Sequence, residues 1–141
     1  FPTDLQAPFT TLMTIANGES KITETIFENR MNHIYLLNEM GARIKLNKNV
    51  AHIKGVKTIK GMNLVGSDLR SSAALIIAGI IAKGSSKIYG LEHLDRGYEN
   101  FELKLKNLGI KITREVSKST FEKNEYKIKT KSEKLSKLKA A

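Results

Sequence analysis

The sequence repeats itself, and this repeat limits the possible folds more than any other feature. Ser20-Lys21-Ile22 matches Ser86-Lys87-Ile88, and Asn29-Arg30 matches Asp95-Arg96. The string from Leu37 to Ile44 matches the string from Leu105 to Ile112. The offset of about 65 residues drifts slowly, as small insertions would produce. We therefore expect two related units, at about 1–67 and 68–116, followed by a tail at 117–141.

Each unit is predicted to alternate helices and strands. Apolar residues at helical spacing predict helices near 5–17, 31–40, 69–82 and 98–108. Alternating residues and turn signals predict strands at 20–26, 42–47, 50–54, 86–91 and 110–115, with a short extended segment at 62–66. Gly41 should end one helix, and Gly18 and Gly84 should end two others. Helices mixed with hairpins predict an α+β fold in which mixed sheets pack on helices.

Composition and charge exclude several classes of protein. No apolar run is long enough to span a membrane, and the absence of cysteine excludes a disulfide scaffold or a thiol nucleophile. The formal net charge is +10, and residues 117–141 hold eight Lys against three Glu. We expect this Lys-rich tail to lie outside the fold and to be disordered. The chain starts at Phe1, within an apparent loop, so we expect it to be a piece of a longer protein.

Arginine is rare in this chain, and its positions are regular. Of the 24 basic residues only five are Arg, and three of these occupy equivalent points of the units. Arg30 and Arg96 precede second helices, and Arg70 begins a first helix. A planar guanidinium grips a carboxylate or phosphate at two points, which Lys cannot do. The spacing therefore predicts an anion site at one end of the units, or, alternatively, arginines that pair with Glu28, Asp68 and Asp95.

Acidic residues stand at the same level of the units. Asp4 and Asp68 each directly precede a helix, where they could simply cap it. The alternative for Asp4 is a general base or an acceptor for a sugar hydroxyl. The three histidines lack metal-ligand spacing, and we expect them on the surface or in local pairs. No metal site is predicted.

Four strings carry a resemblance to a known family. They are Phe1-Pro2-Thr3-Asp4-Leu5-Gln6-Ala7, Thr23-Glu24-Thr25-Ile26-Phe27-Glu28-Asn29-Arg30, Asp68-Leu69-Arg70 and Asp95-Arg96-Gly97-Tyr98-Glu99. Together they resemble the C-terminal quarter of the UDP-N-acetylglucosamine 1-carboxyvinyltransferase family, a group of enolpyruvyl transferases. The resemblance runs in order over residues 1–116.

The resemblance implies a fold, a reaction and a cellular role. Members are built from βαβαββ units in an inside-out α/β barrel, with the active site between two domains. They transfer the enolpyruvyl group of phosphoenolpyruvate to the 3′-hydroxyl of UDP-N-acetylglucosamine, the first committed step of peptidoglycan synthesis. The implied setting is cytoplasmic and concerns cell wall biogenesis, cell shape and cell division. The implied partners are the two substrates and the remaining units of the enzyme, with no cofactor, nucleic acid or membrane.

The resemblance also implies residue roles. Asp4 is similar to the aspartate that deprotonates the acceptor hydroxyl, and Ile26 to a residue whose backbone holds the nucleotide sugar. The arginines resemble those that hold phosphoenolpyruvate and its adduct, with Arg96 nearest the phosphate; they are Arg30, Arg70 and Arg96. Glu28 and Asp68 resemble acids that line the site. The catalytic candidates are therefore Asp4 and Arg96.

Two other functions remain as alternatives. The sister enzyme with shikimate 3-phosphate as acceptor shares the fold, but the string 23–30 resembles the nucleotide-sugar side. A basic, non-catalytic RNA-binding module would need exposed aromatics or a GXXG loop, and the sequence has neither. The chain alone lacks the family's general acid, so we expect it to be inactive by itself.

Overall fold

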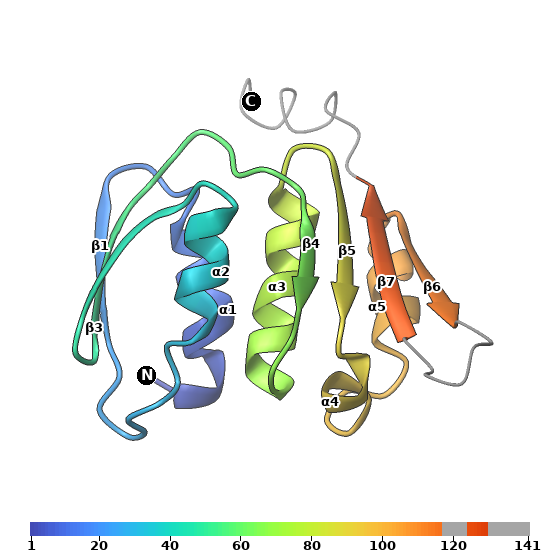
Figure 1. The fold of residues 1–141 in the computed structure, drawn as a ribbon, viewed down its shortest axis with the longest axis horizontal. Coiled ribbons are helices and arrows are strands. Elements are labelled where there is room, and N and C mark those ends of the chain that lie inside the picture. Colours follow the sequence, from blue (N-terminus) through green and yellow to red (C-terminus); the bar gives the residue numbers. More distant parts are fainter. Residues whose placement is uncertain (117–123, 130–141) are drawn as a thin grey trace.

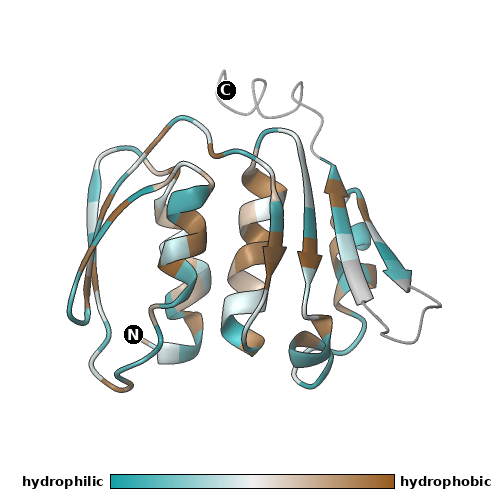
Figure 2. Cartoon of the chain, viewed as in Figure 1, coloured by the Kyte–Doolittle hydropathy of each residue, from teal (hydrophilic) through white to brown (hydrophobic). Residues whose placement is uncertain are grey.

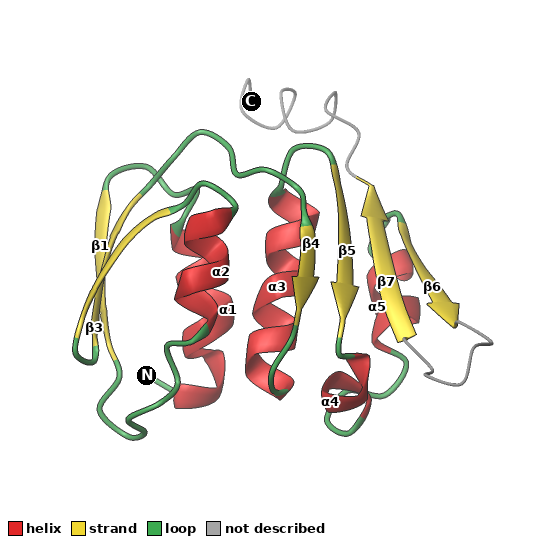
Figure 3. Ribbon diagram, in the orientation of Figure 1, coloured by secondary structure: helices red, strands yellow, loops and turns green. Residues whose placement is uncertain are grey.

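The structure is a computed structural model that describes residues 1–116 and 124–129. Two sheets flank a layer of helices, so that the helices lie inside and the sheets outside (Figures 1 and 3). Helices α1 and α2 pack on the first sheet, α3 packs on α1 and on the second sheet, and α4 and α5 cover the rest of that sheet. The predicted α+β class with a mixed sheet is confirmed.

The first unit ends in an antiparallel hairpin. Its three-stranded sheet has the order β1-β3-β2, with both strand pairs antiparallel. Its elements are η1 (Thr3–Leu5), α1 (Gln6–Met13), β1 (Glu19–Thr23), α2 (His33–Glu39), β2 (Arg43–Asn47) and β3 (Val50–Lys54).

The second unit begins with an additional strand. Its sheet has the order β4-β5-β7-β6, in which only the β4–β5 pair is parallel. Its elements are β4 (Asn63–Val65), α3 (Leu69–Ile81), β5 (Ser85–Tyr89), α4 (Leu91–Asp95), α5 (Phe101–Asn107), β6 (Ile112–Val116) and β7 (Asn124–Lys129).

Strand β7 corrects the expected boundary at residue 116. The order β5-β7-β6 repeats β1-β3-β2, and Ile112 pairs with Ile128 as Ile44 pairs with Ile53. Tyr126 and Ile128 are fully buried, so residues 124–129 complete the second unit instead of forming a tail. Sequence inspection missed this strand because only two apolar residues alternate with lysines in it. The rest of the expected tail lies outside the described residues.

Glycine ends the second helix of each unit in the same way. Gly41 and Gly109 have φ of 99° and 85°, a left-handed conformation that favours glycine. The N–H of Ala42 donates to the carbonyl of Leu37, and the N–H of Ile110 donates to that of Leu105. Both are Schellman motifs, so the prediction for Gly41 is confirmed. Gly18 and Gly84 instead stand directly before β1 and β5, because α1 and α3 end earlier.

Residues with a left-handed backbone conformation also divide the segment 86–108, in which the sequence predicts one strand and one helix. Gly90 has φ of 79° and directly follows β5, which ends two residues before the expected end at 91. The helix expected at 98–108 starts only at 101, because Asn100 adopts φ of 49°. A separate short helix, α4, precedes this break and ends at Asp95. The division leaves residues 96–100 as an exposed turn that carries Arg96.

The core forms where the inner faces of both sheets meet the helices, and apolar residues concentrate on α3 (Figure 2). Helix α3 is buried along most of its length, including Leu75 and Ile76. This fixes the position of its first turn, which carries Arg70. Within the described ranges, no helix has both the length and the apolar character needed to cross a membrane.

Candidate active site

The residues predicted to bind anions lie at one end of the molecule. Figure 1 shows the first residues, the loop between β1 and α2, the start of α3 and helix α4 at this same end. Asp4 lies in η1, Arg30 in the β1–α2 loop and Arg70 in the first turn of α3. Segments that are far apart in the sequence therefore meet here.

Asp4 is held by two of the predicted arginines. Arg70 donates through Nε to Asp4 Oδ1 at 2.7 Å, and its Nη2 lies 2.5 Å from the same oxygen. Arg30 Nη1 lies 3.6 Å from Asp4 Oδ1 and donates to the Thr3 hydroxyl at 2.9 Å. The guanidinium of Arg30 also lies over the Phe27 ring, 3.5 Å from its centre. The Asp4 side chain remains 70% exposed, so its carboxylate is accessible from solvent.

The two aspartates that precede helices have different roles. Asp68 caps α3, because its Oδ1 accepts the backbone N–H groups of Arg70 and Ser71 at 2.9 and 3.0 Å. Asp4 makes no such cap; η1 follows Pro2 without a side-chain hydrogen bond. The cap interpretation therefore holds for Asp68 and fails for Asp4. The arginines do form ion pairs, but Arg30 and Arg70 pair with Asp4 and not with their sequence neighbours.

Glu24 holds the loop that carries Ile26 and Arg30, and sequence inspection did not select it. This buried carboxylate accepts hydrogen bonds from the Thr3 hydroxyl at 2.7 Å and from the N–H groups of Ile26 and Phe27 at 2.9 and 3.3 Å. Burial disfavours its charged form, but these hydrogen bonds and the charge of Arg30 outweigh burial and hold the pKa of Glu24 below its ordinary value. The signal available in the sequence was a carboxylate inside the loop that also carries Ile26 and Arg30.

A pocket of about 240 Å³ adjoins the ion-paired cluster. His33 lies in its wall, and burial lowers the pKa of His33 to about 4, against the opposing effects of Asp68 and a hydrogen bond to the Arg30 backbone. Its ring is therefore neutral at neutral pH, and Nε2 has no hydrogen-bond partner among the described residues. His33 is thus buried, and of the two sequence expectations only the local pairing holds. The pocket is lined by Gln6, Ala7, Asn29, Arg30, Asn32, His33, Asp68, Arg70 and Ser71.

The remaining predicted residues surround this cluster without joining its ion pairs. Ile26 is 64% exposed, and Glu28 is exposed at the edge of a neighbouring pocket. Arg96 is exposed at the end of α4 and has no ion pair within residues 1–116 and 124–129. Asp95, its neighbour in sequence, instead receives two hydrogen bonds from Arg114, at 2.9 and 2.5 Å.

Gly97 brings the Arg96 turn close to the start of α3. A Cβ at Gly97 would lie 2.6 Å from Cδ2 of Leu69, so a larger residue there would require the Leu69 side chain to shift. Leu69 directly precedes Arg70, so the glycine permits the two arginine-bearing segments to pack together. The close approach places Arg96 on the same side of the molecule as the Asp4 cluster.

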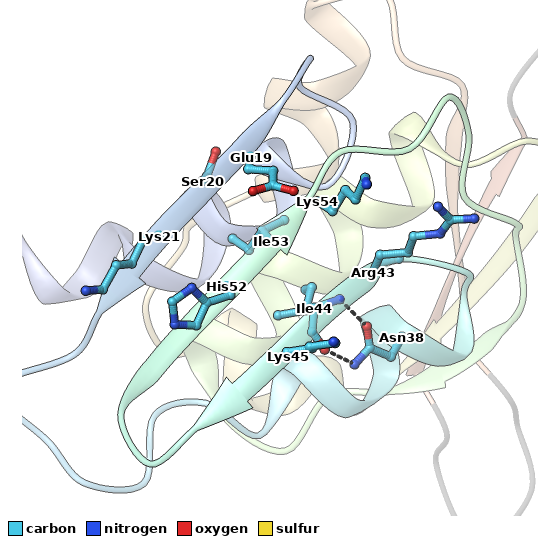
Figure 4. Close-up of a pocket in the computed structure, with 11 residues that line it drawn as sticks. Glu19, Ser20, Lys21, Asn38, Arg43, Ile44, Lys45, His52, Ile53 and Lys54 are labelled. Carbon is cyan, nitrogen blue, oxygen red and sulfur yellow. Dashed lines mark hydrogen bonds between the residues drawn. The ribbon is translucent and has the colours of Figure 1, made fainter.

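A second pocket, of about 750 Å³, lies on the β1-β3-β2 sheet and has a different character. Lys21, His52 and Lys45 form one cross-strand row there (Figure 4). The pocket contains none of the residues selected from the sequence. Its exposed lysines belong to a solvated sheet face, so the site at the helix ends is the better candidate for chemistry.

The arrangement at the helix ends can bind an anion beside a carboxylate base. Two guanidinium groups converge on one exposed carboxylate, and a third faces solvent nearby. A substrate with a carboxylate or a phosphate could exchange for Asp4 on Arg30 or Arg70. Asp4 would then accept a proton from a hydroxyl held next to that anion.

The chain shares its fold with a known class of enzymes. The chain superposes on the enolpyruvyl transferase NikO from Streptomyces tendae with a TM-score of 0.70, at 23% identity, over 92% of this chain and 27% of that one. The fold is thus that of the enolpyruvyl transferases, as the resemblance implied. The sequence model of the EPSP synthase (3-phosphoshikimate 1-carboxyvinyltransferase) family matches residues 1–105, and the chain belongs to this family.

Relatives within the family carry a more specific name. A UDP-N-acetylglucosamine 1-carboxyvinyltransferase of Prochlorococcus marinus strain AS9601 is 90% identical over all 141 residues, and that of strain MIT 9312 is 84% identical over the same length. The resemblance seen in the sequence is thereby confirmed. In both cases the chain spans 31% of the relative's length.

Proposed function

We propose that this chain forms one wall of the active site of an enzyme that transfers the enolpyruvyl group of phosphoenolpyruvate to the 3′-hydroxyl of UDP-N-acetylglucosamine. The observation that carries the proposal is the exposed Asp4 carboxylate held by Arg30 and Arg70. The names of the highly similar relatives support the choice of acceptor. The remaining units of the enzyme would supply the opposite wall.

The proposed reaction assigns distinct roles to these residues. Arg30, Arg70 and Arg96 bind the carboxylate and phosphate of phosphoenolpyruvate and stabilise the charge that develops during addition. Asp4 accepts the proton of the attacking hydroxyl as the new C–O bond forms, because an alcohol is a weak nucleophile until it loses that proton. As this bond forms, the π electrons of phosphoenolpyruvate take up a proton at C3, which a general acid of the remaining units would supply. Loss of a proton from C3 then restores the double bond as the C–O bond to phosphate breaks and phosphate leaves.

The other predicted residues would position the substrates. The backbone of Ile26 contacts the nucleotide sugar, and Glu24 fixes this backbone by accepting its N–H. Asp68 fixes the first turn of α3, so that the Arg70 side chain starts from a defined position. Glu28 lines the substrate site. The reaction requires no metal or organic cofactor.

We further propose that the reaction belongs to cell wall construction. Its product, enolpyruvyl-UDP-N-acetylglucosamine, is the first committed precursor of peptidoglycan, which links the enzyme to cell shape and cell division. Both substrates are cytoplasmic metabolites, so the enzyme would act in the cytoplasm.

The proposal is tested in a hybrid enzyme, in which this chain replaces the matching 141 residues of the AS9601 relative. Phosphate release is measured with phosphoenolpyruvate and either UDP-N-acetylglucosamine or shikimate 3-phosphate. We expect turnover with the nucleotide sugar only, and a loss of more than about tenfold, or ~1.4 kcal/mol, in Asp4→Asn. Glu19→Gln, which changes an exposed acid on β1, should retain the rate.

Two results would contradict the proposal. Turnover with shikimate 3-phosphate alone would assign the sister activity to the site. Full turnover in Asp4→Asn would show that the carboxylate only pairs with its arginines.

A further inference from the structure

The turn that carries Arg96 is held at both ends by side chains from the second sheet. Asp95 precedes the turn at the end of α4, and Glu102 follows it in the first turn of α5. Arg114 from β6 donates through Nη1 and Nη2 to the two carboxylate oxygens of Asp95, at 2.9 and 2.5 Å. Tyr126 from β7 donates its hydroxyl to Glu102 at 2.7 Å.

The two contacts form one connected network. Arg114 and Tyr126 are directly paired residues of β6 and β7, and the guanidinium of Arg114 lies 5.7 Å from the centre of the Tyr126 ring. Arg114 Nη1 also lies 3.9 Å from Glu102. Burial raises the pKa of Tyr126, and the hydrogen bond to Glu102 acts in the same direction, so the hydroxyl keeps its proton and donates. The same hydrogen bond and Arg114 help to hold the pKa of Glu102 below its ordinary value, although burial opposes this.

The network leaves Arg96 available. Its guanidinium could pair with Asp95 next to it, which was one expectation from the sequence. Arg114 occupies both oxygens of Asp95 instead, and Arg96 has no carboxylate partner in the part of the chain that the structure describes. Gly97 meanwhile lets the turn pack on Leu69, beside Arg70. The turn is thus fixed at Asp95, at Glu102 and against α3, while its cationic side chain points to solvent.

We propose that Arg114 is a positioning residue, whose fork holds Asp95 and thereby orients Arg96 toward an anionic substrate. The inference rests on the proposed function, in which Arg96 binds the phosphate of phosphoenolpyruvate. Arg114 does not touch the substrate and acts through the turn. A lysine at this position keeps the charge but loses the second hydrogen bond and the fixed plane of the guanidinium.

The experiment compares steady-state kinetics of Arg114→Lys, Arg96→Lys and the double variant in the hybrid enzyme. In Arg114→Lys we expect the KM for phosphoenolpyruvate to rise about tenfold, with less than about a threefold change in the KM for UDP-N-acetylglucosamine. If Arg114 acts through Arg96, adding Arg114→Lys to Arg96→Lys should raise this KM by less than about threefold more. Arg43→Lys is the matched control, because Arg43 lies exposed on β2, the counterpart of β6.

The outcomes separate this inference from the proposed function. Equal changes in both KM values, or independent effects of the two substitutions, would overturn the positioning role. A lowered melting temperature of Arg114→Lys with unchanged KM values would show that Arg114 only stabilises the fold. Absence of turnover in the unaltered hybrid enzyme would instead contradict the proposed function itself.

Discussion

Replacing Glu24 by Gln should loosen the loop that carries Ile26 and Arg30. The side chain is only 4% exposed and accepts three hydrogen bonds, two of them from the N–H groups of Ile26 and Phe27. Glutamine has nearly the same shape but replaces one acceptor oxygen with a donor NH₂ group. The amide oxygen can still accept from the two N–H groups, but it carries no charge, and the NH₂ group forces the hydrogen bond with the Thr3 hydroxyl to reverse its direction.

The expected magnitude follows from the number and charge of these bonds. A hydrogen bond to a charged group contributes about 1.5–3 kcal/mol and one between neutral groups about 1 kcal/mol, so losing the charge should favour local opening by roughly threefold to thirtyfold. Ile26 and Phe27 have exposed side chains, so packing adds little protection to their amides. Within the described ranges, their N–H groups have no backbone acceptor, so Glu24 is the source of their protection.

Amide hydrogen exchange of residues 24–30 in the hybrid enzyme measures this opening directly. We expect faster exchange at Ile26 and Phe27 in Glu24→Gln, and unchanged exchange in the control Glu19→Gln. We also expect a higher KM for UDP-N-acetylglucosamine, since the proposed contact is made by the Ile26 backbone. Equal exchange in the unaltered and Glu24→Gln proteins would refute the assigned role of Glu24.

The pH dependence provides a second check. Because the folded-state pKa of Glu24 lies below its ordinary value of 4.5, its contribution to stability is present above that value. It is lost as the pH falls through the lowered folded-state pKa. The difference in exchange between the two proteins should therefore be full at neutral pH and disappear in acid. A difference in exchange that persisted below the folded-state pKa of Glu24 would show that the shape of this side chain, and not its charge, protects the amides.

Three further predictions use simple variants. Arg96→Lys should weaken phosphoenolpyruvate binding far more than nucleotide-sugar binding in isothermal titration, because lysine loses the fork; equal changes would argue against a direct contact. Removing residues 117–141 should lower the melting temperature of the hybrid enzyme by several degrees, since Tyr126 and Ile128 are fully buried and contribute about 2 kcal/mol each; an unchanged melting curve would show that β7 is dispensable. The 141-residue chain alone should release no phosphate in a coupled assay, and turnover above background would mean that it holds a complete site.

Much of the candidate site could be selected from the sequence because the repeat marks equivalent positions. Helix ends and the loops beside them recur in both units, so Arg30, Arg70 and Arg96 stood out as exceptions in a lysine-rich chain. Asp4 was selected together with them. Glu24 and Arg114 were missed, because their importance depends on which backbone amides and carboxylates the fold brings to them.

The sequence by itself determined most of the local structure and the duplicated plan. Helical spacing, alternation and turn glycines such as Gly41 act over a few residues, so they can be read without knowledge of the fold. Only the tertiary structure decided the pairing: Arg70 with Asp4 across 66 positions, Arg114 in place of Arg96 on Asp95, and β7 between β5 and β6. Such contacts join residues that are distant in the sequence, and the sequence alone allows several arginines as the partner of one carboxylate. Packing of the helices between the sheets selects among them, because it fixes which side chains come within hydrogen-bond distance.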